Sequence, residues 1–125
     1  MATVLLVDDS PVARRVLSKR LAAEGFVVAQ EASAAGARGI DAKMLACAIV
    51  DLELADGDGV ELASALLASN ASLAIAFFTG GAPPESLARA SERGPVFCKP
   101  DLEPVIAWVK ARSAPRSDAQ PPPTK

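Results

Sequence analysis

The sequence predicts an α/β fold, a doubly wound (βα)5 sandwich built on a five-stranded parallel sheet. Along the 125-residue chain, five short apolar segments alternate with stretches of helical periodicity. The apolar segments are hydrophobic throughout rather than at every second residue, which is typical of parallel strands covered on both faces. Right-handed crossovers between such strands place helices on both sides of the sheet.

The expected strands and helices follow one another without a second domain. The strands are predicted at 3–8, 26–30, 45–51, 73–79 and 95–98. The helices are predicted from Pro11 to a stop at Gly25 and over about 33–43, 59–69, 84–92 and 102–113. Together they make one domain over residues 1–112. Residues 113–125 are polar and Pro-rich, and we expect them to form a disordered tail.

The first and last helices carry clear sequence signals. Ser10 is a suitable N-cap, and Pro11 fits the first helical position. The apolar residues that recur at helical spacing in the first helix are Val12, Val16, Leu17 and Leu21. Those on one face of the last helix are Leu102, Val105, Ile106 and Val109. Trp108 lies off that face, so it is either an interface anchor or part of the packing at the rim.

The composition excludes several classes of function. A net charge of −2 argues against a nucleic-acid surface, and no apolar segment approaches the ~18–20 residues that span a bilayer. We therefore expect a cytoplasmic protein. Histidine is absent, which excludes a Ser-His-Asp triad, a Cys-His pair and a His-ligated zinc site. Cys47 and Cys98 lie in apolar runs and are expected to be buried, reduced thiols, a redox role for Cys98 being the alternative.

Polar side chains gather where the predicted strands end. In a doubly wound sheet, ligands bind beyond the carboxyl ends of the strands. The residues predicted there are Asp8, Asp9, Asp51, Thr79 and Lys99. Three carboxylates in a small volume repel one another unless a cation neutralises them, and Mg²⁺ prefers oxygen ligands. A carboxylate can also be the nucleophile in phosphoryl transfer, which explains why an apolar strand ends in Asp51.

Four short motifs make the chain similar to the receiver domains of response regulators in two-component signalling, in particular the stand-alone, CheY-like ones. They are LLVDDS (5–10), IVDLELADGDGVEL (49–62), FFTGG (77–81) and CKP (98–100). Each motif is weak alone, but together they occur in the family's order and at predicted strand ends. The resemblance covers about residues 2–112 and implies a flavodoxin-like strand order, 2-1-3-4-5.

The resemblance also implies a role for each polar residue at this edge. Asp51 is the expected phosphoacceptor, and its donor is a histidine kinase or a histidine phosphotransfer protein. Mg²⁺ is expected to bind Asp8, Asp9, Asp51 and the backbone carbonyl of Glu53. Lys99 is expected to contact a phosphoryl oxygen. Such a protein is not an enzyme but a phosphoacceptor that assists its own phosphorylation and dephosphorylation.

The switching residues depart from the common pattern of the family. Thr79 is expected to move and hydrogen-bond the phosphoryl group, and the Lys99-Pro100 bond is expected to be cis. Many receivers carry Tyr or Phe three residues before the lysine, where this chain has Val96 followed by Phe97. A Thr–aromatic switch is therefore not expected. The FFTGG motif resembles a subset of stand-alone receivers that also lack this aromatic, and the GGAPP loop after strand four offers a mobile segment instead.

Partner surfaces and alternative functions follow from the same residues. The basic residues of the first helix, Arg14, Arg15, Lys19 and Arg20, form either a docking face for a kinase or a solvated face. The fourth helix, fifth strand and fifth helix are expected to contact a downstream target. The alternative function is a degenerate receiver that serves as a phosphorylation-independent adaptor, which Val96 favours and the complete polar set disfavours. A phosphatase of the haloacid-dehalogenase kind is disfavoured because that family has Asp-x-Asp, whereas Asp8 and Asp9 are adjacent.

Overall fold

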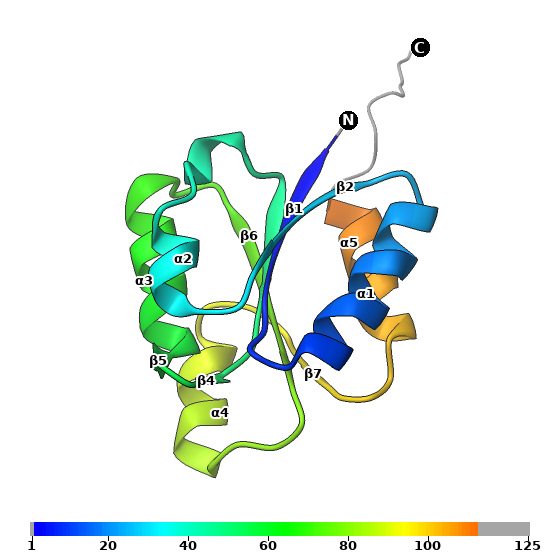
Figure 1. Ribbon diagram of the computed structural model, residues 1–125. Coiled ribbons are helices and arrows are strands. Elements are labelled where there is room, and N and C mark those ends of the chain that lie inside the picture. Colours follow the sequence, from blue (N-terminus) through cyan, green and yellow to red (C-terminus); the bar gives the residue numbers. More distant parts are fainter. Residues whose placement is uncertain (1, 113–125) are drawn as a thin grey trace, which may run out of the picture.

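The computed structural model describes residues 2–112 and has the predicted parallel sheet between two helical layers (Figure 1). The main sheet consists of β1 (Thr3–Val7), β2 (Val27–Glu31), β3 (Cys47–Val50), β6 (Ala74–Thr79) and β7 (Val96–Cys98). The helices are α1 (Pro11–Ala23), α2 (Ala34–Arg38), α3 (Gly59–Ser69), α4 (Pro84–Ser91) and α5 (Glu103–Arg112). The sheet order, β2-β1-β3-β6-β7, is the predicted 2-1-3-4-5. The predicted tail, 113–125, lies outside the described residues.

The sheet separates two hydrophobic cores. Helices α2, α3 and α4 cover one face, and α1 and α5 cover the other (Figure 1). Neighbouring strand residues point to opposite sides: Leu5, Val50 and Phe77 belong to the first core, whereas Leu6, Ile49 and Phe78 belong to the second. Since both faces are covered, β3 is apolar at every position, and β1 and β6 are apolar except for one terminal threonine each, which confirms the reasoning from long apolar runs.

Two local predictions about the second helix and the acidic loop were incomplete. The helix predicted over 33–43 is split into α2 and a 3-10 turn, η1 (Ala42–Met44), because Gly39 caps α2 and the Asp41 carboxylate begins the new turn. The loop after Asp51 contains a two-stranded hairpin of β4 (Glu53–Leu54) and β5 (Gly57–Asp58) that the sequence did not predict. Asp56 at its tip accepts hydrogen bonds from the first two N–H groups of α2, at 2.8 and 3.1 Å, and so ties the hairpin to that helix.

The buried face of α1 is narrower than the sequence predicts. Leu17 and Leu21 are buried, but Val12 and Val16 are 73% and 44% exposed. Residue 16 lies about 100° around the helix from residue 17, so a helix that turns Leu17 to the sheet carries its neighbour away from it. The valines therefore form an exposed ridge. In residues 2–112, no helix is long and apolar enough to cross a membrane.

Candidate functional site

Asp8 and Asp9 follow β1, and their carboxylates differ sharply in exposure. Asp8 is 2% exposed, whereas Asp9 is exposed, as expected where side chains alternate along extended backbone. The Asp8 N–H donates to the Glu31 carbonyl at 3.1 Å, which continues the pairing of β1 with β2. Asp8 Oδ1 accepts a hydrogen bond from the N–H of Ser10 at 2.9 Å, and the Ser10 hydroxyl caps α1 as predicted. Asp8 is thus fixed at the sheet edge, and Asp9 faces solvent.

Strand β3 brings Asp51 to the same edge. Its N–H donates to the Val7 carbonyl at 2.9 Å, its side chain is largely buried, and its Oδ1 accepts from the Glu53 N–H at 3.3 Å. Gly59, at the start of α3, lies directly against this segment. A Cβ on Gly59 would collide with the Asp51 carbonyl oxygen and lie 2.9 Å from the Leu52 Cα. Sequence reasoning missed this role, because a glycine after aspartate is typical of an ordinary turn.

Lys99 joins the two buried carboxylates. Its Nζ lies 2.8 Å from Asp8 Oδ2 and 3.0 Å from Asp51 Oδ2. Its N–H donates to the Thr79 carbonyl at 2.9 Å, which holds the residue at the end of the β6–β7 pair. The Lys99-Pro100 bond is cis, as the resemblance implies. The structure therefore brings together three of the predicted site residues from three separate strands.

Two effects set the pKa values in this site: burial of the side chains and the charge of the Lys99 ammonium. Burial raises the pKa of Asp51, and the hydrogen bond and charge of Lys99 offset only part of that effect. Burial by itself would lower the pKa of Lys99, but its hydrogen bonds to Asp8 and Asp51 outweigh burial and raise it. With Asp9 included, the site holds three carboxylates and one ammonium, so it retains negative charge that a cation can neutralise.

The donor set fits a magnesium ion. Asp8, Asp9 and Asp51 each offer a carboxylate oxygen, and these oxygens lie within 4.8 Å of one another. Carboxylate oxygens are the hard ligands that Mg²⁺ prefers, and exposed Asp9 leaves room for the waters that Mg²⁺ usually keeps. The side chain of Glu53 is exposed, and the role of its carbonyl as a ligand stays a prediction.

Thr79 is buried at the end of β6, and its surroundings suit a movable hydroxyl. Its Oγ1 accepts a hydrogen bond from the Gly81 N–H at 3.4 Å, a long and weak bond. Gly81 has a φ of +148°, a backbone conformation that favours glycine. Val96, at the position of the family's aromatic, packs partly buried against the core beneath α2, α3 and α4, and Phe97 packs on the opposite core.

Two predictions about residues outside the site are corrected or resolved. Cys47 is buried as expected, but Cys98 is exposed, because it is the last residue of β7 and β7 is an edge strand. Trp108 packs partly buried against the core beneath α1 and α5, which favours the packing interpretation. Its Nε1 is buried and makes no hydrogen bond.

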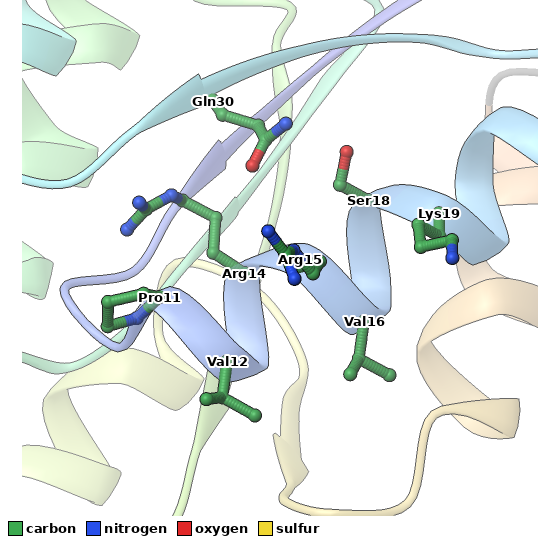
Figure 2. A pocket seen from close by; sticks show the side chains of 8 residues that line it. All are labelled: Pro11, Val12, Arg14, Arg15, Val16, Ser18, Lys19 and Gln30. Carbon is green, nitrogen blue, oxygen red and sulfur yellow. The ribbon is translucent and has the colours of Figure 1, made fainter.

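The basic residues of α1 do not form one continuous face. Arg20 forms a paired hydrogen bond with Glu103 of α5, at 2.7 and 3.2 Å, which raises the pKa of the arginine. Arg14 donates from Nη1 to the Asp8 carbonyl at 2.7 Å, so it borders the acidic site. Arg14, Arg15 and Lys19 line a hollow on the side of α1 toward β2, in which Gln30 also lies (Figure 2).

Comparison with known proteins agrees with this fold. A family model described as response regulator receiver domain matches residues 4–97. No curated protein matches the chain. Among solved structures, a CheY-like receiver domain protein from Methanospirillum hungatei has a TM-score of 0.81 at 23% identity, covering 89% of this chain and 92% of that one. Chemotaxis protein CheY4 of Vibrio cholerae has 0.80 at 24%, covering 90% and 98%. The response regulator TrrA of Thermotoga maritima, solved in complex with Mg²⁺ and BeF, has 0.79 at 21%, covering 89% and 98%.

Proposed function

The chain belongs to the response regulator receiver domain family, and on this basis we propose that it is a signalling switch phosphorylated on Asp51 by a histidine kinase or a histidine phosphotransfer protein. The observation that carries the proposal is the pairing of one ammonium with two buried carboxylates. Lys99 lies 2.8 Å from Asp8 and 3.0 Å from Asp51 at the carboxyl edge of the sheet. This edge is where doubly wound folds bind ligands.

In the proposed reaction, the bond between phosphorus and an imidazole nitrogen of the donor breaks, and a bond between phosphorus and an Asp51 carboxylate oxygen forms. Asp51 must be ionised to attack. Burial opposes ionisation by raising the pKa of Asp51, and the nearby Lys99 ammonium favours the carboxylate. The same ammonium can neutralise charge on the phosphoryl oxygens, which is the main requirement of phosphoryl transfer.

The residues proposed to hold Mg²⁺ are Asp8, Asp9, Asp51 and the backbone carbonyl of Glu53. The ion, when bound, supplies further charge neutralisation for the phosphoryl oxygens. The oxygens that three of these residues offer lie within 4.8 Å of one another, which supports their assignment as ligands. Asp8 and Asp51 each keep one oxygen on a backbone N–H and the other on Lys99, so their orientation does not depend on the ion.

Thr79 is the proposed reporter of phosphorylation. Its hydroxyl accepts only a weak hydrogen bond, from the Gly81 N–H, so little energy is lost when that bond breaks. The glycines that follow Thr79 allow the loop before α4 to rearrange. Residue 96 is valine, so no aromatic ring at this position can move when the Thr79 hydroxyl moves. Movement of the loop and of α4 therefore replaces an aromatic switch in this proposal, and the surface of α4, β7 and α5 contacts the downstream target.

The second candidate is an adaptor that works without phosphorylation, which Val96 favours. Intact mass spectrometry after incubation with phosphoramidate distinguishes the two. With Mg²⁺ the wild type is expected to gain one phosphoryl group, which Asp51→Asn abolishes and EDTA suppresses. Asp41→Ala removes an exposed aspartate at a distant turn and should leave the gain unchanged. An unmodified wild type under these conditions, or an Asp51→Asn variant that is still modified, would contradict the proposal.

A further inference from the structure

Helix α4 is held in place by little apolar packing. Among its eight residues only Ala90 is buried, and Leu87 packs partly buried against the core. Its N-terminus, at Pro83, has no side-chain cap, and the loop before it contains Gly81 with a φ of +148°. Polar contacts therefore supply a large share of what fixes the position of α4.

Two arginines, Arg89 and Arg93, connect this helix to α3. Arg89 Nη1 donates to Asp58 Oδ2 at 2.9 Å. Arg93, just beyond the end of α4, donates from Nε to the Ser64 hydroxyl at 3.2 Å. The pair of Arg89 with Asp58 is the one ion pair of α4 within residues 2–112. In Figure 1, α4 lies next to the β4–β5 hairpin, at the end where α3 begins. The helix is thus attached at the point where the hairpin joins α3.

Asp58 links that ion pair to the carboxylate site. Its Oδ1 accepts from the Val60 N–H at 2.8 Å, which caps α3, and its Oδ2 accepts from Arg89. Its backbone pairs with that of Glu53 across the β4–β5 hairpin. The Glu53 N–H in turn donates to Asp51 Oδ1 at 3.3 Å. Two residues, Glu53 and Asp58, therefore connect the proposed phosphoacceptor to α4.

Phosphorylation changes this connection at its first contact. Asp51 Oδ1 accepts from the Glu53 N–H, and Oδ2 accepts from Lys99. A phosphoryl group on either oxygen leaves one carbonyl oxygen where two carboxylate oxygens accepted before, so these hydrogen bonds must rearrange. Because Glu53 pairs with Asp58, a movement of β4 also moves the carboxylate that binds Arg89.

We propose that the Asp58–Arg89 ion pair holds α4 in its unphosphorylated position, and that phosphorylation of Asp51 releases α4 through the β4–β5 hairpin. The release rests on the proposed function, whereas the holding role does not. The side chains of Arg89 and Asp58 are 48% and 31% exposed, so the pair contributes modestly. Its loss should shift the equilibrium between held and released α4 by about two- to fivefold.

The holding role is tested by amide hydrogen exchange, measured by NMR on the full-length, ¹⁵N-labelled protein without Mg²⁺ or phosphodonor. Arg89→Gln removes the charge, and the α4 amides should exchange about two- to fivefold faster. Asp58→Asn keeps a good N-cap residue for α3 but removes the negative charge, so it should have the same effect. The double variant should exchange no faster than either single variant, because both lose the same contact. Glu92→Gln is the matched control: it removes an exposed charge beside α4 that forms no ion pair in the described part of the chain, and exchange should stay unchanged.

The release is tested by titrating beryllofluoride, a phosphoryl mimic, into the same protein in Mg²⁺. The α4 amide signals of the wild type should move toward their positions in Arg89→Gln. Since coupling between two equilibria is reciprocal, Arg89→Gln should also bind beryllofluoride more tightly, by at most about fivefold.

Each half of the proposal has results that overturn it. Wild-type exchange in Arg89→Gln, an equal acceleration in Glu92→Gln, or additive effects in the double variant would overturn the holding role. Beryllofluoride that binds without moving the α4 signals, or that binds Arg89→Gln no more tightly than the wild type, would overturn the release. If phosphoramidate does not label Asp51, the proposed function fails and the release with it, and the exchange pattern alone then decides the holding role.

Discussion

Gly59→Ala tests how closely α3 is packed beneath the proposed phosphoacceptor. The added Cβ would meet the Asp51 carbonyl oxygen and lie 2.9 Å from the Leu52 Cα, at least ~0.6 Å inside the optimal separation of two carbon atoms. Backbone atoms cannot rotate away as a side chain does, so we take the upper end of an overpacking cost, about 3 kcal/mol. Replacing a helical glycine by alanine also stabilises the helix, by at most about 1 kcal/mol. The net loss of stability is therefore about 2 kcal/mol.

Urea denaturation followed by circular dichroism measures this loss directly. For an assumed m-value of about 2 kcal/mol/M, the midpoint falls by about 1 M. The rate of Mg²⁺-dependent phosphorylation should fall as well, because relief of the collision displaces Asp51. Gly39→Ala is the matched control: its Cβ would lie 3.4 Å from the Gly36 carbonyl oxygen, an ordinary contact, and its φ is −80°. A Gly59→Ala variant that unfolds and is phosphorylated like the wild type would refute the packing argument.

Three further predictions concern the ion pairs of Lys99, the hydrogen bonds of Asp56 and the core. Lys99→Met leaves two buried carboxylates without their ammonium, so it should destabilise the protein by about 2–4 kcal/mol in EDTA and less in Mg²⁺, by urea denaturation. Backbone hydrogen bonds from Ala34 and Ala35 lower the pKa of Asp56, so its contribution to stability is present above ~pH 4 and is lost as pH falls through the lowered value. Asp56→Asn should therefore be less stable than the wild type at pH 7, and the difference between their thermal melts should narrow as the pH falls through the lowered pKa of Asp56. Phe77→Ala, in the fully buried centre of β6, should cost about 3–5 kcal/mol in urea.

Each of these predictions has an outcome that contradicts it. A Lys99→Met variant as stable as the wild type in EDTA would show that the carboxylates do not need the ammonium. A stability gap between Asp56→Asn and the wild type that does not narrow as the pH is lowered from 7 into the acid range would exclude the carboxylate charge as its source. A loss below about 1 kcal/mol for Phe77→Ala would mean that the core closes around the missing ring.

Long-range features of the fold were easier to predict than local ones. Buried parallel strands produce uninterrupted apolar runs, so the strands and their polar ends could be located along the chain. The hairpin at Glu53–Leu54 and Gly57–Asp58 could not, because two-residue strands have no periodicity. Helical spacing likewise placed Val12 and Val16 on an apolar stripe but did not show which part of it the sheet would cover.

The candidate site was predictable as a set of residues but not as a set of contacts. Strand ends placed Asp8, Asp51 and Lys99 at one edge, and the resemblance supplied their expected roles. In the structure, the Lys99 ammonium lies between the carboxylates of Asp8 and Asp51. This arrangement depends on the register of the strands and the direction of each side chain, and neither can be read from a short stretch of sequence. The close approach of Gly59 to β3 depends on the angle at which α3 enters, so it too required the structure.

The division of the interior into two cores has a consequence for how the chain tolerates change. Leu5 and Leu6 are neighbours in sequence, yet they pack under different helical layers, and the two clusters have no buried residue in common. Substitutions under α3 should add independently to substitutions under α1, since separated sites seldom couple. The layer of α1 and α5 can therefore diverge in sequence while the packing on the other face of the sheet stays unchanged.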